Sequence, residues 1–416
     1  MFSILDSAAI LLVLSAAFSW ANHRFLGLPR TTGLLLTGLI VSLLLVGVDF
    51  AVPNEHLHAA LTQALLQVDF SEVVMNGMLA FLLFAGALDV DFGALRSRAW
   101  PIAFLAIAGT TLSTAIVGGA FWGATQLVGT PIPLAWALVF GALISPTDPV
   151  AVLSTLKSVQ LPKALEAELQ GEALFNDGVG VVLFTVLVGL AVGSSAQGTD
   201  APGLGHLLLR EVLGGLTLGL AAGYLAFRAM RAIDDFAVEV LITLALVTGT
   251  YALAERLEAS GPLAVVAAGL LIGDRGPRFA MSDRTQRYVS TLWTLIDEVL
   301  NSVLFLLIGL EVIILRLRGI DPAQAALAIP IVLAARLVAL ATPILAFPAT
   351  LSATNLPFLT WAGIRGGISV ALALSLPDTA AKPMILAATY AVVLFSILIQ
   401  GSTLGWLARR TIAKPA

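Results

Sequence analysis

The sequence contains no cysteine and few charged residues. Without cysteine there can be no disulfide, no thiolate metal site and no cysteine nucleophile. Asp, Glu, Lys and Arg together make up only 12% of the 416 residues, about half the share found in a soluble globular protein. Because 58% of the residues are hydrophobic, the composition cannot supply the polar surface of a soluble fold. We therefore predict an all-α polytopic membrane protein.

Signals of several other functional classes are also missing. There is no basic tail and the net charge is −4, so nothing indicates a nucleic-acid partner. No glycine-rich phosphate-binding loop precedes a lysine, so we expect no cofactor and no ATP-driven pumping. Residues Met1–Asp6 lack the positive segment of a cleaved signal peptide, so the first apolar run should remain as a span. The histidines lie in loops or near span ends, which argues against a membrane enzyme; they are His23, His56, His58 and His206.

About thirteen apolar segments are long enough to cross a bilayer, for which a helix needs roughly 20 residues. They are Leu5–Ala21, Pro29–Val48, Ser71–Asp89, Ala99–Val128, Ile132–Thr155, Glu166–Ser194, Leu204–Arg228, Phe236–Arg256, Pro262–Asp274, Thr285–Leu315, Ala323–Phe347, Asn355–Leu376 and Pro383–Arg409. With this count, 15 of the 22 basic residues fall on one side of the membrane and five on the other. The positive-inside rule then predicts an external N-terminus and a cytoplasmic C-terminus.

A few charged residues fall inside these apolar spans, where each charge costs about 2.5–3.5 kcal/mol to insert. Such residues usually face a cavity or a charged partner. They are Asp148, Glu172, Asp177, Glu298, Arg336 and Arg365.

The first constellation is Gly141–Val150, which reads GALISPTDPV. Pro146 and Pro149 have no N–H group, so the helix should be broken at residues 145–148. Free carbonyls, the Thr147 hydroxyl and the Asp148 carboxylate are the oxygen ligands that a small hard cation prefers. The alternative is a proline kink whose carboxylate is paired for structural reasons.

The second constellation is Gly171–Gly180, GEALFNDGVG. Glu172 and Asn176 are four residues apart and share a helix face, and Asp177 follows about 100° further round, so Asn176 and Asp177 can border one cavity. The alternative is an ordinary helix start with polar residues at the interface, which fits Asp177 poorly because an apolar run follows it at once.

The third constellation is Gly363–Ser369, GIRGGIS. Gly366 and Gly367 permit non-helical backbone in an otherwise apolar span. Two interrupted spans, one in each half of the chain, are typical of an inverted-repeat transporter with its site where they meet. Arg365 would offset the partial negative charge of the helix ends there; the alternative is an arginine that snorkels to the interface.

Arg336 stands alone in its span and needs a carboxylate partner. Glu172 is the preferred partner, because the two aspartates are more useful left for a cation. The alternatives are Glu298 and Glu311. Glu298 and Asn301 could otherwise act together as structural polar contacts between helices.

At these residues the chain resembles the NhaP-type antiporters, in the bacterial branch of the monovalent cation–proton antiporter superfamily. The matching segments are Gly141–Val152, Glu172–Val182, Gly363–Pro377 and Phe81–Leu88. The resemblance implies an antiporter fold with two crossed discontinuous helices, built as a six-plus-six inverted repeat with one extra N-terminal helix. It implies a single transmembrane domain over residues 1–416 without a soluble regulatory domain. The mobile core would comprise 71–194 and 285–376, and the remainder would form a dimerisation scaffold.

The resemblance also assigns roles to residues. Asp177 matches the essential aspartate that binds cation or proton, with Asp148, Thr147 and Asn176 beside it. Glu172 and Arg336 match a buried structural ion pair. The residues that correspond to the crossing of the two broken helices in the family are Pro146, Pro149, Arg365, Gly366 and Gly367.

Two departures from the family leave the choice among Na⁺, Li⁺ and K⁺ open. Ala173 stands where several relatives have a serine, and Ala85 where some archaeal relatives have an acidic side chain. Both losses would thin the ligand shell. The resemblance further implies a homodimer in a bacterial inner membrane and a role in pH homeostasis.

The expected mechanism follows from one ionisable carboxylate at the site. Burial makes a carboxylate easier to protonate, and Asp177 can then hold either a proton or a monovalent cation, Na⁺ in the first instance. With Asn176 neutral, exchange of one cation for one proton moves no net charge. The rival hypotheses are an ion-coupled carrier of an organic solute, a cation channel and a membrane enzyme.

Overall fold

The computed structural model describes residues 4–51, 78–90, 99–148, 152, 163–193, 201–316, 322–346 and 355–411. Within these ranges the chain is helical, and no β-strand occurs. Eight of the described helices are long and apolar enough to cross a membrane, and three shorter apolar helices accompany them. The composition-based prediction of an all-α membrane protein is therefore confirmed.

The helical elements follow the predicted spans closely. In the first half they are α1 (Ile4–Ala21), the π-helical segment η1 (Asn22–Leu26), α2 (Arg30–Ala51), α5 (Leu79–Leu88), α7 (Ala99–Phe104), η3 (Leu105–Gly109), α8 (Thr110–Val128), α9 (Leu134–Ile144) and α11 (Lys163–Ala191). In the second half they are α12 (Ala201–Met230), α13 (Phe236–Arg256), α14 (Gly261–Phe279), α15 (Asp283–Arg316), α16 (Pro322–Ala326), α17 (Ala328–Ala346), α18 (Leu356–Trp361), α19 (Gly367–Leu374), α20 (Lys382–Phe395), η6 (Ser396–Gln400) and α21 (Gly401–Thr411). Each of the thirteen predicted spans overlaps one of these helices or a consecutive group of them, within the described part of the chain.

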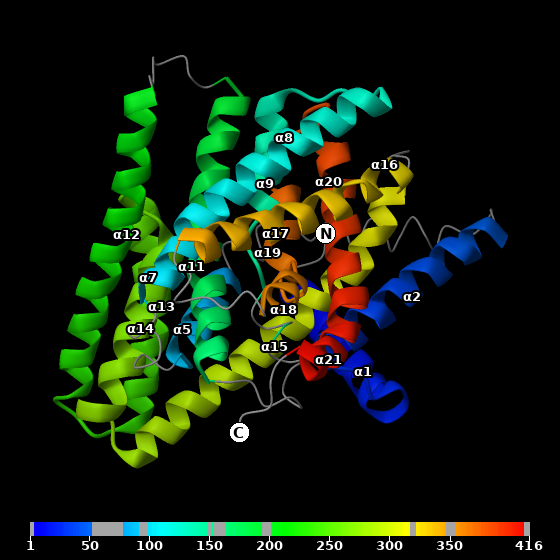
Figure 1. Ribbon diagram of the computed structural model, residues 1–416. Helices are drawn as coiled ribbons and strands as arrows, with labels where there is room; N and C mark the ends of the chain where they lie inside the picture. Colours follow the sequence, from blue (N-terminus) through cyan, green and yellow to red (C-terminus); the bar gives the residue numbers. More distant parts are fainter. Residues whose placement is uncertain are drawn as a thin grey trace.

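Helices α12, α13 and α14 stand together at the left of Figure 1, apart from the crossed helices at the centre. Small residues let α12 and α14 approach closely, as is usual where lipid offers no hydrophobic drive for helix association. A Cβ atom on Gly219 of α12 would lie only 2.0 Å from the carbonyl oxygen of Ala264 in α14.

The 34-residue helix α15 connects the two sides of the molecule. It runs obliquely across the lower part of Figure 1 and packs against α13, α5, α2 and α1. Its contact with α2 is close, since a Cβ atom on Gly309 would meet the carbonyl oxygen of Leu35 at 2.7 Å. Because α15 also passes beside the centre of the fold, residues in its middle can reach the site described below.

Local sequence signals explain several helix ends. The Asp235 carboxylate accepts hydrogen bonds from the backbone N–H groups of Ala237 and Val238 at 2.9 and 3.2 Å, and so caps the start of α13. Gly129 ends α8 with a positive φ of 82°, a backbone conformation that glycine adopts without strain.

Both predicted interruptions are present. Helix α9 ends at Ile144, and the next residues, 145–148, are not helical. Helix α18 ends at Trp361, and α19 begins only at Gly367 after an extended Gly366. Pro149, which was expected to contribute to the first interruption, lies outside the described residues, as do His56 and His58.

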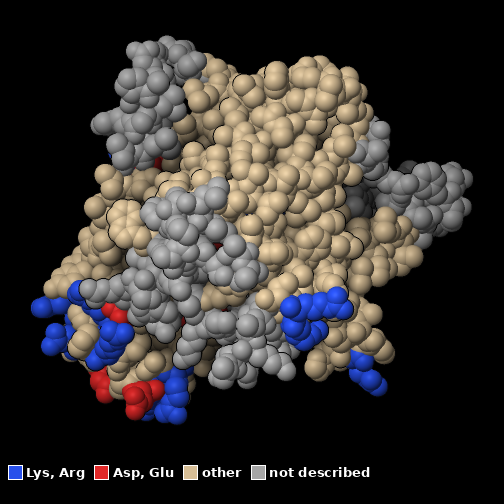
Figure 2. All heavy atoms as spheres, in the orientation of Figure 1, with Lys and Arg blue, Asp and Glu red and all other residues tan. Residues whose placement is uncertain are grey.

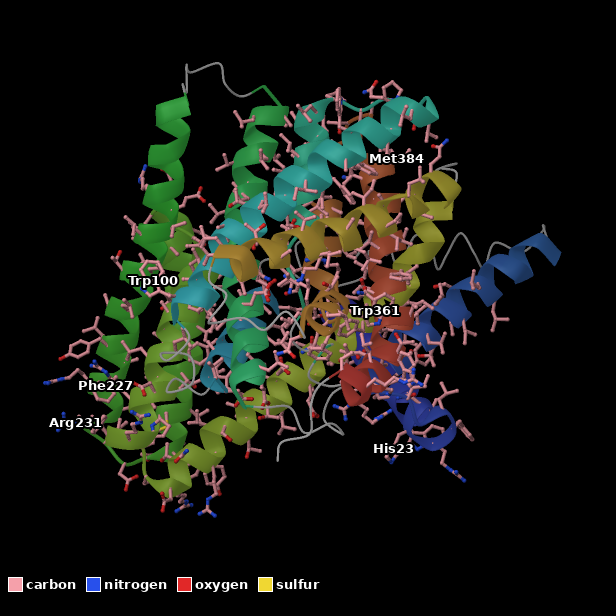
Figure 3. All side chains as sticks on the ribbon, viewed as in Figure 1. His23, Trp100, Phe227, Arg231, Trp361 and Met384 are labelled. Atoms are coloured by element: carbon pink, nitrogen blue, oxygen red, sulfur yellow. The ribbon has the colours of Figure 1, made fainter. Side chains whose placement is uncertain are left out.

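Charged side chains on the visible surface gather at one end of the molecule. Figure 2 shows them at the lower end, while the rest of the described surface on this face carries almost none. The last turns of α12 and α21 contribute Arg228, Arg409 and Arg410. Figure 3 places Arg231 and His23 at the same end, and Met384 towards the other. Elsewhere large apolar side chains are exposed, such as Leu225 at 69% and Leu241 at 64%, as expected for a surface that faces lipid.

Candidate cation-binding site

The two interrupted spans cross at the centre of the molecule and are joined there by their backbones. The N–H group of Asp148 donates a hydrogen bond to the carbonyl oxygen of Ile364 at 2.8 Å. The approach leaves no room for a side chain on Gly366, because its Cβ atom would lie 2.1 Å from Asp148 Oδ2. Glycine is therefore required at this position by packing.

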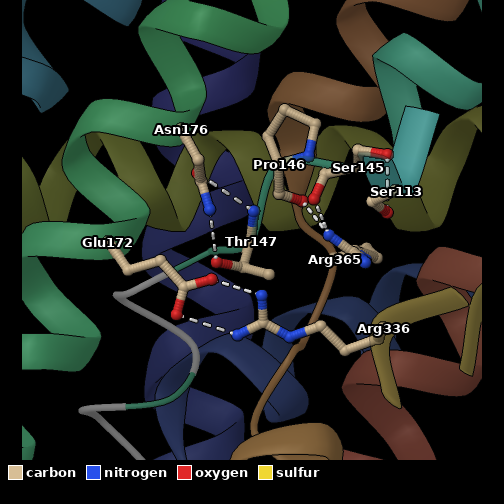
Figure 4. A network of polar contacts seen from close by, with 8 residues as sticks. All are labelled: Ser113, Ser145, Pro146, Thr147, Glu172, Asn176, Arg336 and Arg365. Atoms are coloured by element: carbon tan, nitrogen blue, oxygen red, sulfur yellow. Dashed lines mark hydrogen bonds and ion pairs between the residues drawn. The ribbon is translucent and has the colours of Figure 1, made fainter. Parts of the chain in front are cut away.

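Arg365 binds the end of the first broken helix. Its Nη1 atom donates hydrogen bonds to the carbonyl oxygens of Ser145 and Pro146, the latter at 2.8 Å (Figure 4). These carbonyls are free because α9 stops before them, and the positive guanidinium complements the partial negative charge of a helix C-terminus. The side chain is only 1% exposed, so it does not snorkel to a membrane interface.

Asn176 holds the unwound segment from the side of α11. Its Nδ2 group donates to Thr147 Oγ1 at 2.9 Å, and its Oδ1 atom accepts from the Thr147 backbone N–H at 3.3 Å (Figure 4). Both ends of the amide are thus engaged with one residue. Gly180 lets α11 approach this segment, since a Cβ atom there would lie 2.2 Å from Pro146 Cγ.

Arg336 forms a buried ion pair with Glu172. Arg336 Nη1 and Nη2 contact the two carboxylate oxygens, the second at 3.0 Å, in the two-pronged geometry that guanidinium and carboxylate favour (Figure 4). The two side chains are 9% and 5% exposed. Of the alternative partners, Glu298 instead contacts Arg30 at 2.6 Å near the surface, and the side chain of Glu311 lies outside the described residues.

A cavity of about 60 Å³ lies beside the crossing. That volume admits a few particles the size of a water molecule. Its walls come from α5, the unwound segment after α9, α11, α15 and the start of α19. Most of the lining is apolar, and the polar residues in it are Thr147, Asp148, Asp177, Asn301 and Ser369.

Asp177 is the most deeply buried carboxylate of this cavity, with 4% of the residue exposed. Among the described residues, none donates a hydrogen bond to its carboxylate, and the nearby charges that act on it are those of Asp148 and Arg365. The described residues contain no cluster of three or more His, Cys, Asp or Glu that could hold a metal ion. The cavity offers two carboxylates, from Asp148 and Asp177, together with hydroxyl and amide groups from Thr147, Ser369 and Asn301. Oxygen atoms of these kinds suit a singly charged hard cation or a proton.

Four positions differ in detail from the expectation. Asn176 does not line the cavity, because both of its amide atoms face Thr147. Ala173 and Ala85 are buried, at 2% and 5% exposure, but neither lines the cavity. Asn301 hydrogen-bonds to Asp297 in its own helix, whereas Glu298 contacts Arg30 of α2, so the two side chains have different partners.

Two cavity residues were not expected as site residues. The sequence indicates Asn301 only as a structural contact, and Ser369, which is 2% exposed, only as the end of a glycine motif. The only sequence signal for Asn301 was its position four residues after Asp297, which puts both on one face of α15. Nothing in the sequence indicated that this face turns towards Asp177.

Comparisons with known proteins agree with this arrangement. The family model described as "Sodium/hydrogen exchanger, transmembrane" matches residues 11–410. The "Na(+)/H(+) antiporter NhaP" of Pseudomonas aeruginosa is 44% identical over 99% of this chain and 97% of its own length. The "Na(+)/H(+) antiporter NhaH" of Halobacillus dabanensis is 35% identical over 96% of each chain. The solved structure of the sodium proton antiporter MjNhaP1 from Methanocaldococcus jannaschii at pH 8 has the same fold, with a TM-score of 0.77 over 99% of this chain and 100% of that one, at 19% identity.

Proposed function

The chain belongs to the sodium/hydrogen exchanger family, and from this premise we propose that it exchanges Na⁺ for H⁺ across a membrane, with both ions competing for Asp177. It is a transporter and not an enzyme. The observation that carries the proposal is a buried carboxylate without a hydrogen-bond donor among the described residues, in a cavity that also receives Thr147 and Asp148.

Competition at one carboxylate is sufficient for exchange. A protonated Asp177 is neutral and no longer attracts a cation, whereas a bound cation makes protonation unfavourable through charge repulsion. Thr147 and Asp148 would supply further oxygen atoms to the cation. If the site opens to one side of the membrane at a time, each cation carried one way is followed by a proton carried the other way.

Asn176 supports a one-for-one stoichiometry. It is neutral, and its amide holds Thr147 at the edge of the cavity, so we assign it a positioning role. Because Asn176 carries no proton, exchange at Asp177 would move one positive charge in each direction. Transport is then expected to be electroneutral.

The buried basic residues have structural roles in this scheme. Arg336 neutralises Glu172, so that this carboxylate does not compete for the cation. Arg365 stabilises the free carbonyls at the crossing and offsets part of the negative charge of Asp177. We infer that this arrangement keeps the crossing intact when Asp177 loses its ion.

The membrane setting is inferred from the same features. The basic residues at the lower end in Figure 2 support a cytoplasmic position for that end, with the N-terminus outside and the C-terminus inside. We further propose that the protein lies in a bacterial inner membrane and forms a homodimer. Its mobile core would comprise residues 71–194 and 285–376. Na⁺ is the favoured cation, and Li⁺ and K⁺ are the candidates to be tested beside it.

The test is cation-induced proton movement in inside-out vesicles with an imposed pH gradient. Addition of NaCl, LiCl or KCl should collapse the gradient, and clamping the voltage with a permeant ion should not change the rate. Asp177→Asn should abolish the response. Thr185→Val, an exposed position on the same helix, is the matched control and should leave exchange unchanged.

Lowering the pH should raise the KM for the cation without lowering the rate at saturating cation. Exchange by Asp177→Asn at the wild-type rate, or no response to any of the three cations, would overturn the proposal.

A further inference from the structure

The cavity has one polar wall that does not come from the broken helices or from α11. Asn301, in the middle of α15, lines the same cavity as Asp177, Asp148 and Thr147. The residue is only 6% exposed, so its amide is almost entirely withdrawn from bulk solvent. A buried amide of this kind must place each of its two ends against a suitable partner, because an unsatisfied polar atom is costly.

The hydrogen bonds fix which end of the Asn301 amide faces where. Its Nδ2 group donates to the main-chain carbonyl oxygen of Asp297 at 3.0 Å and to Asp297 Oδ1 at 2.9 Å. A main-chain carbonyl can only accept, so the nitrogen must face Asp297 whatever the protonation of that carboxyl group. The carbonyl oxygen of the Asn301 side chain is therefore turned away from Asp297, and no described residue donates a hydrogen bond to it.

We propose that Asn301 is a further cation-binding residue, which presents its side-chain oxygen to the cation in the cavity, and that Asp297 is the positioning residue that fixes this orientation. The inference rests on the exchange function proposed above and deepens it. An amide oxygen is a ligand that hard cations accept beside carboxylate and hydroxyl oxygens. Being neutral, it adds affinity for the cation without adding a proton-binding group, so the one-for-one stoichiometry is kept.

The electrostatic surroundings favour the same role. Asp148 and Asp177 line the same narrow, mainly apolar cavity as Asn301. Two carboxylates in such a cavity concentrate a negative potential that attracts cations. Asn301 would thus lie where an arriving cation exchanges part of its water shell for protein oxygens.

The position of Asn301 also gives the cation a link between separate parts of the fold. Thr147 and Asp148 belong to the crossing, Asp177 belongs to α11, and Asn301 belongs to α15, which packs against α13 and α2. A cation bound by residues of the crossing, of α11 and of α15 would join these three parts of the fold. A proton on Asp177 can be shared with at most one further acceptor, so it cannot join all of these parts of the fold. Asn301 should therefore affect cation binding more than proton binding.

The experiment measures the KM for Na⁺ and Li⁺ in the vesicle assay at alkaline pH, where proton competition is weakest. Asn301→Ala should raise the KM for Na⁺ by about tenfold or more, the scale on which loss of groups that orient or bind a metal ion lowers affinity. The maximal rate should stay within about twofold, because Asp177 is intact. The ratio of the Na⁺ and Li⁺ KM values should also change, which a loss of folded protein cannot produce.

The positioning role of Asp297 is tested with a double-mutant cycle. Asp297→Leu should raise the KM for Na⁺ less than Asn301→Ala does, because the main-chain carbonyl still holds the amide. In the Asp297→Leu/Asn301→Ala protein the KM should equal that of Asn301→Ala alone. If the fold-changes in KM of the two single variants multiply in the double variant, the assigned role of Asp297 is overturned.

The matched control is Ser302→Ala. Ser302 adjoins Asn301, does not line the cavity, and donates its hydroxyl to the Glu298 carbonyl. Its KM should equal that of the wild type. If Asn301→Ala is poorly folded, Asn301→Ser takes its place, and Na⁺-dependent thermal stabilisation of the purified protein replaces the transport assay.

Two results separate this inference from the proposed function. An unchanged KM in Asn301→Ala or Asn301→Ser, with exchange still abolished by Asp177→Asn, would overturn the role of Asn301 and leave the exchange function standing. If the wild-type protein shows no Na⁺-dependent exchange, the proposed function itself is overturned.

Discussion

The two breaks that meet at the centre of the protein are built differently. The first, at residues 145–148, follows from a proline, which lacks the N–H group needed to continue α9. The second, at residues 363–366, is rich in glycine and contains an arginine. The first break exposes carbonyls and brings the oxygens of Thr147 and Asp148 to the cavity, whereas the second supplies the guanidinium that binds those carbonyls.

This difference shows how two discontinuous helices can share one site without repeating each other. The proline break leaves carbonyl oxygens without a helical hydrogen-bond donor. The opposite break therefore has to supply a donor and a positive charge, which Arg365 does. Glycine in the second break has a separate purpose, because it allows the Asp148 side chain to lie directly over the Gly366 backbone. One break therefore offers ligands, and the other stabilises and accommodates them.

The largest effect is expected from removing the donor in the second break. Arg365→Leu leaves the carbonyls of Ser145 and Pro146 buried without a partner, at about 1–3 kcal/mol each, and removes a charge from among buried carboxylates. Exchange in vesicles should fall by more than about 100-fold. Arg365→Lys keeps the charge and should recover part of the rate; full activity of Arg365→Leu would contradict the capping role.

A smaller but still severe effect is expected from closing the space between the breaks. Gly366→Ala would place a Cβ atom 2.1 Å from Asp148 Oδ2, whereas Gly363→Ala would place one at the longer distance of 3.0 Å from Nε of Arg336. Overpacking of this kind costs about 1–3 kcal/mol. The rate should fall by more than about tenfold in Gly366→Ala and by less than about threefold in Gly363→Ala. Equal losses in the two variants would show that steric contact with Asp148 is not the cause.

The ion pair beside the second break is expected to affect stability more than ion affinity. Glu172→Gln leaves the Arg336 charge buried without its partner, which costs about 3–5 kcal/mol. The melting temperature in detergent should fall, while the KM for Na⁺ in any protein that remains folded should change little. A large increase in that KM, with stability retained, would instead make Glu172 part of the ion site.

Loss of the hydrogen bonds that support the first break from the side should raise the KM for Na⁺ more than loss of the ion pair beside the second break. Asn176→Ala removes both hydrogen bonds that hold Thr147, each worth about 0.5–1.5 kcal/mol. We expect the KM for Na⁺ to rise by about tenfold, with transport still electroneutral. Asn176→Ser, which can keep one bond to Thr147, should lie between alanine and wild type. Measurement of the rate with and without a voltage clamp checks the stoichiometry.

The smallest effect is expected at an ion pair that belongs to neither break. Glu298 and Arg30 are 39% and 52% exposed, and such a pair contributes about 0–1 kcal/mol. Glu298→Gln should therefore leave the melting temperature and exchange close to wild type, and should set the baseline for Glu172→Gln. A destabilisation as large as that of Glu172→Gln would mean that exposure does not distinguish the two pairs.

Composition and local pattern were sufficient for much of this architecture. Apolar length predicts spans because lipid cannot satisfy backbone groups outside a helix. Proline and glycine within apolar spans predict both breaks, since the first removes a donor and the second permits extended backbone. Charges inside spans identify the central residues, because each must be paired or must serve a cavity. All of these signals act over a few neighbouring residues.

The identity of partners depended on contacts between distant parts of the chain. Arg336 and Glu172 are 164 positions apart, and Arg365 lies 220 positions from Ser145. Three glutamates were open to Arg336 from sequence alone, and only packing brings Glu172 to it. The turn of Asn176 towards Thr147, and of the Asn301 oxygen away from Asp297, likewise follow from which helix faces meet. Local pattern determines which groups must be satisfied, whereas the three-dimensional packing of the helices determines which atoms satisfy them.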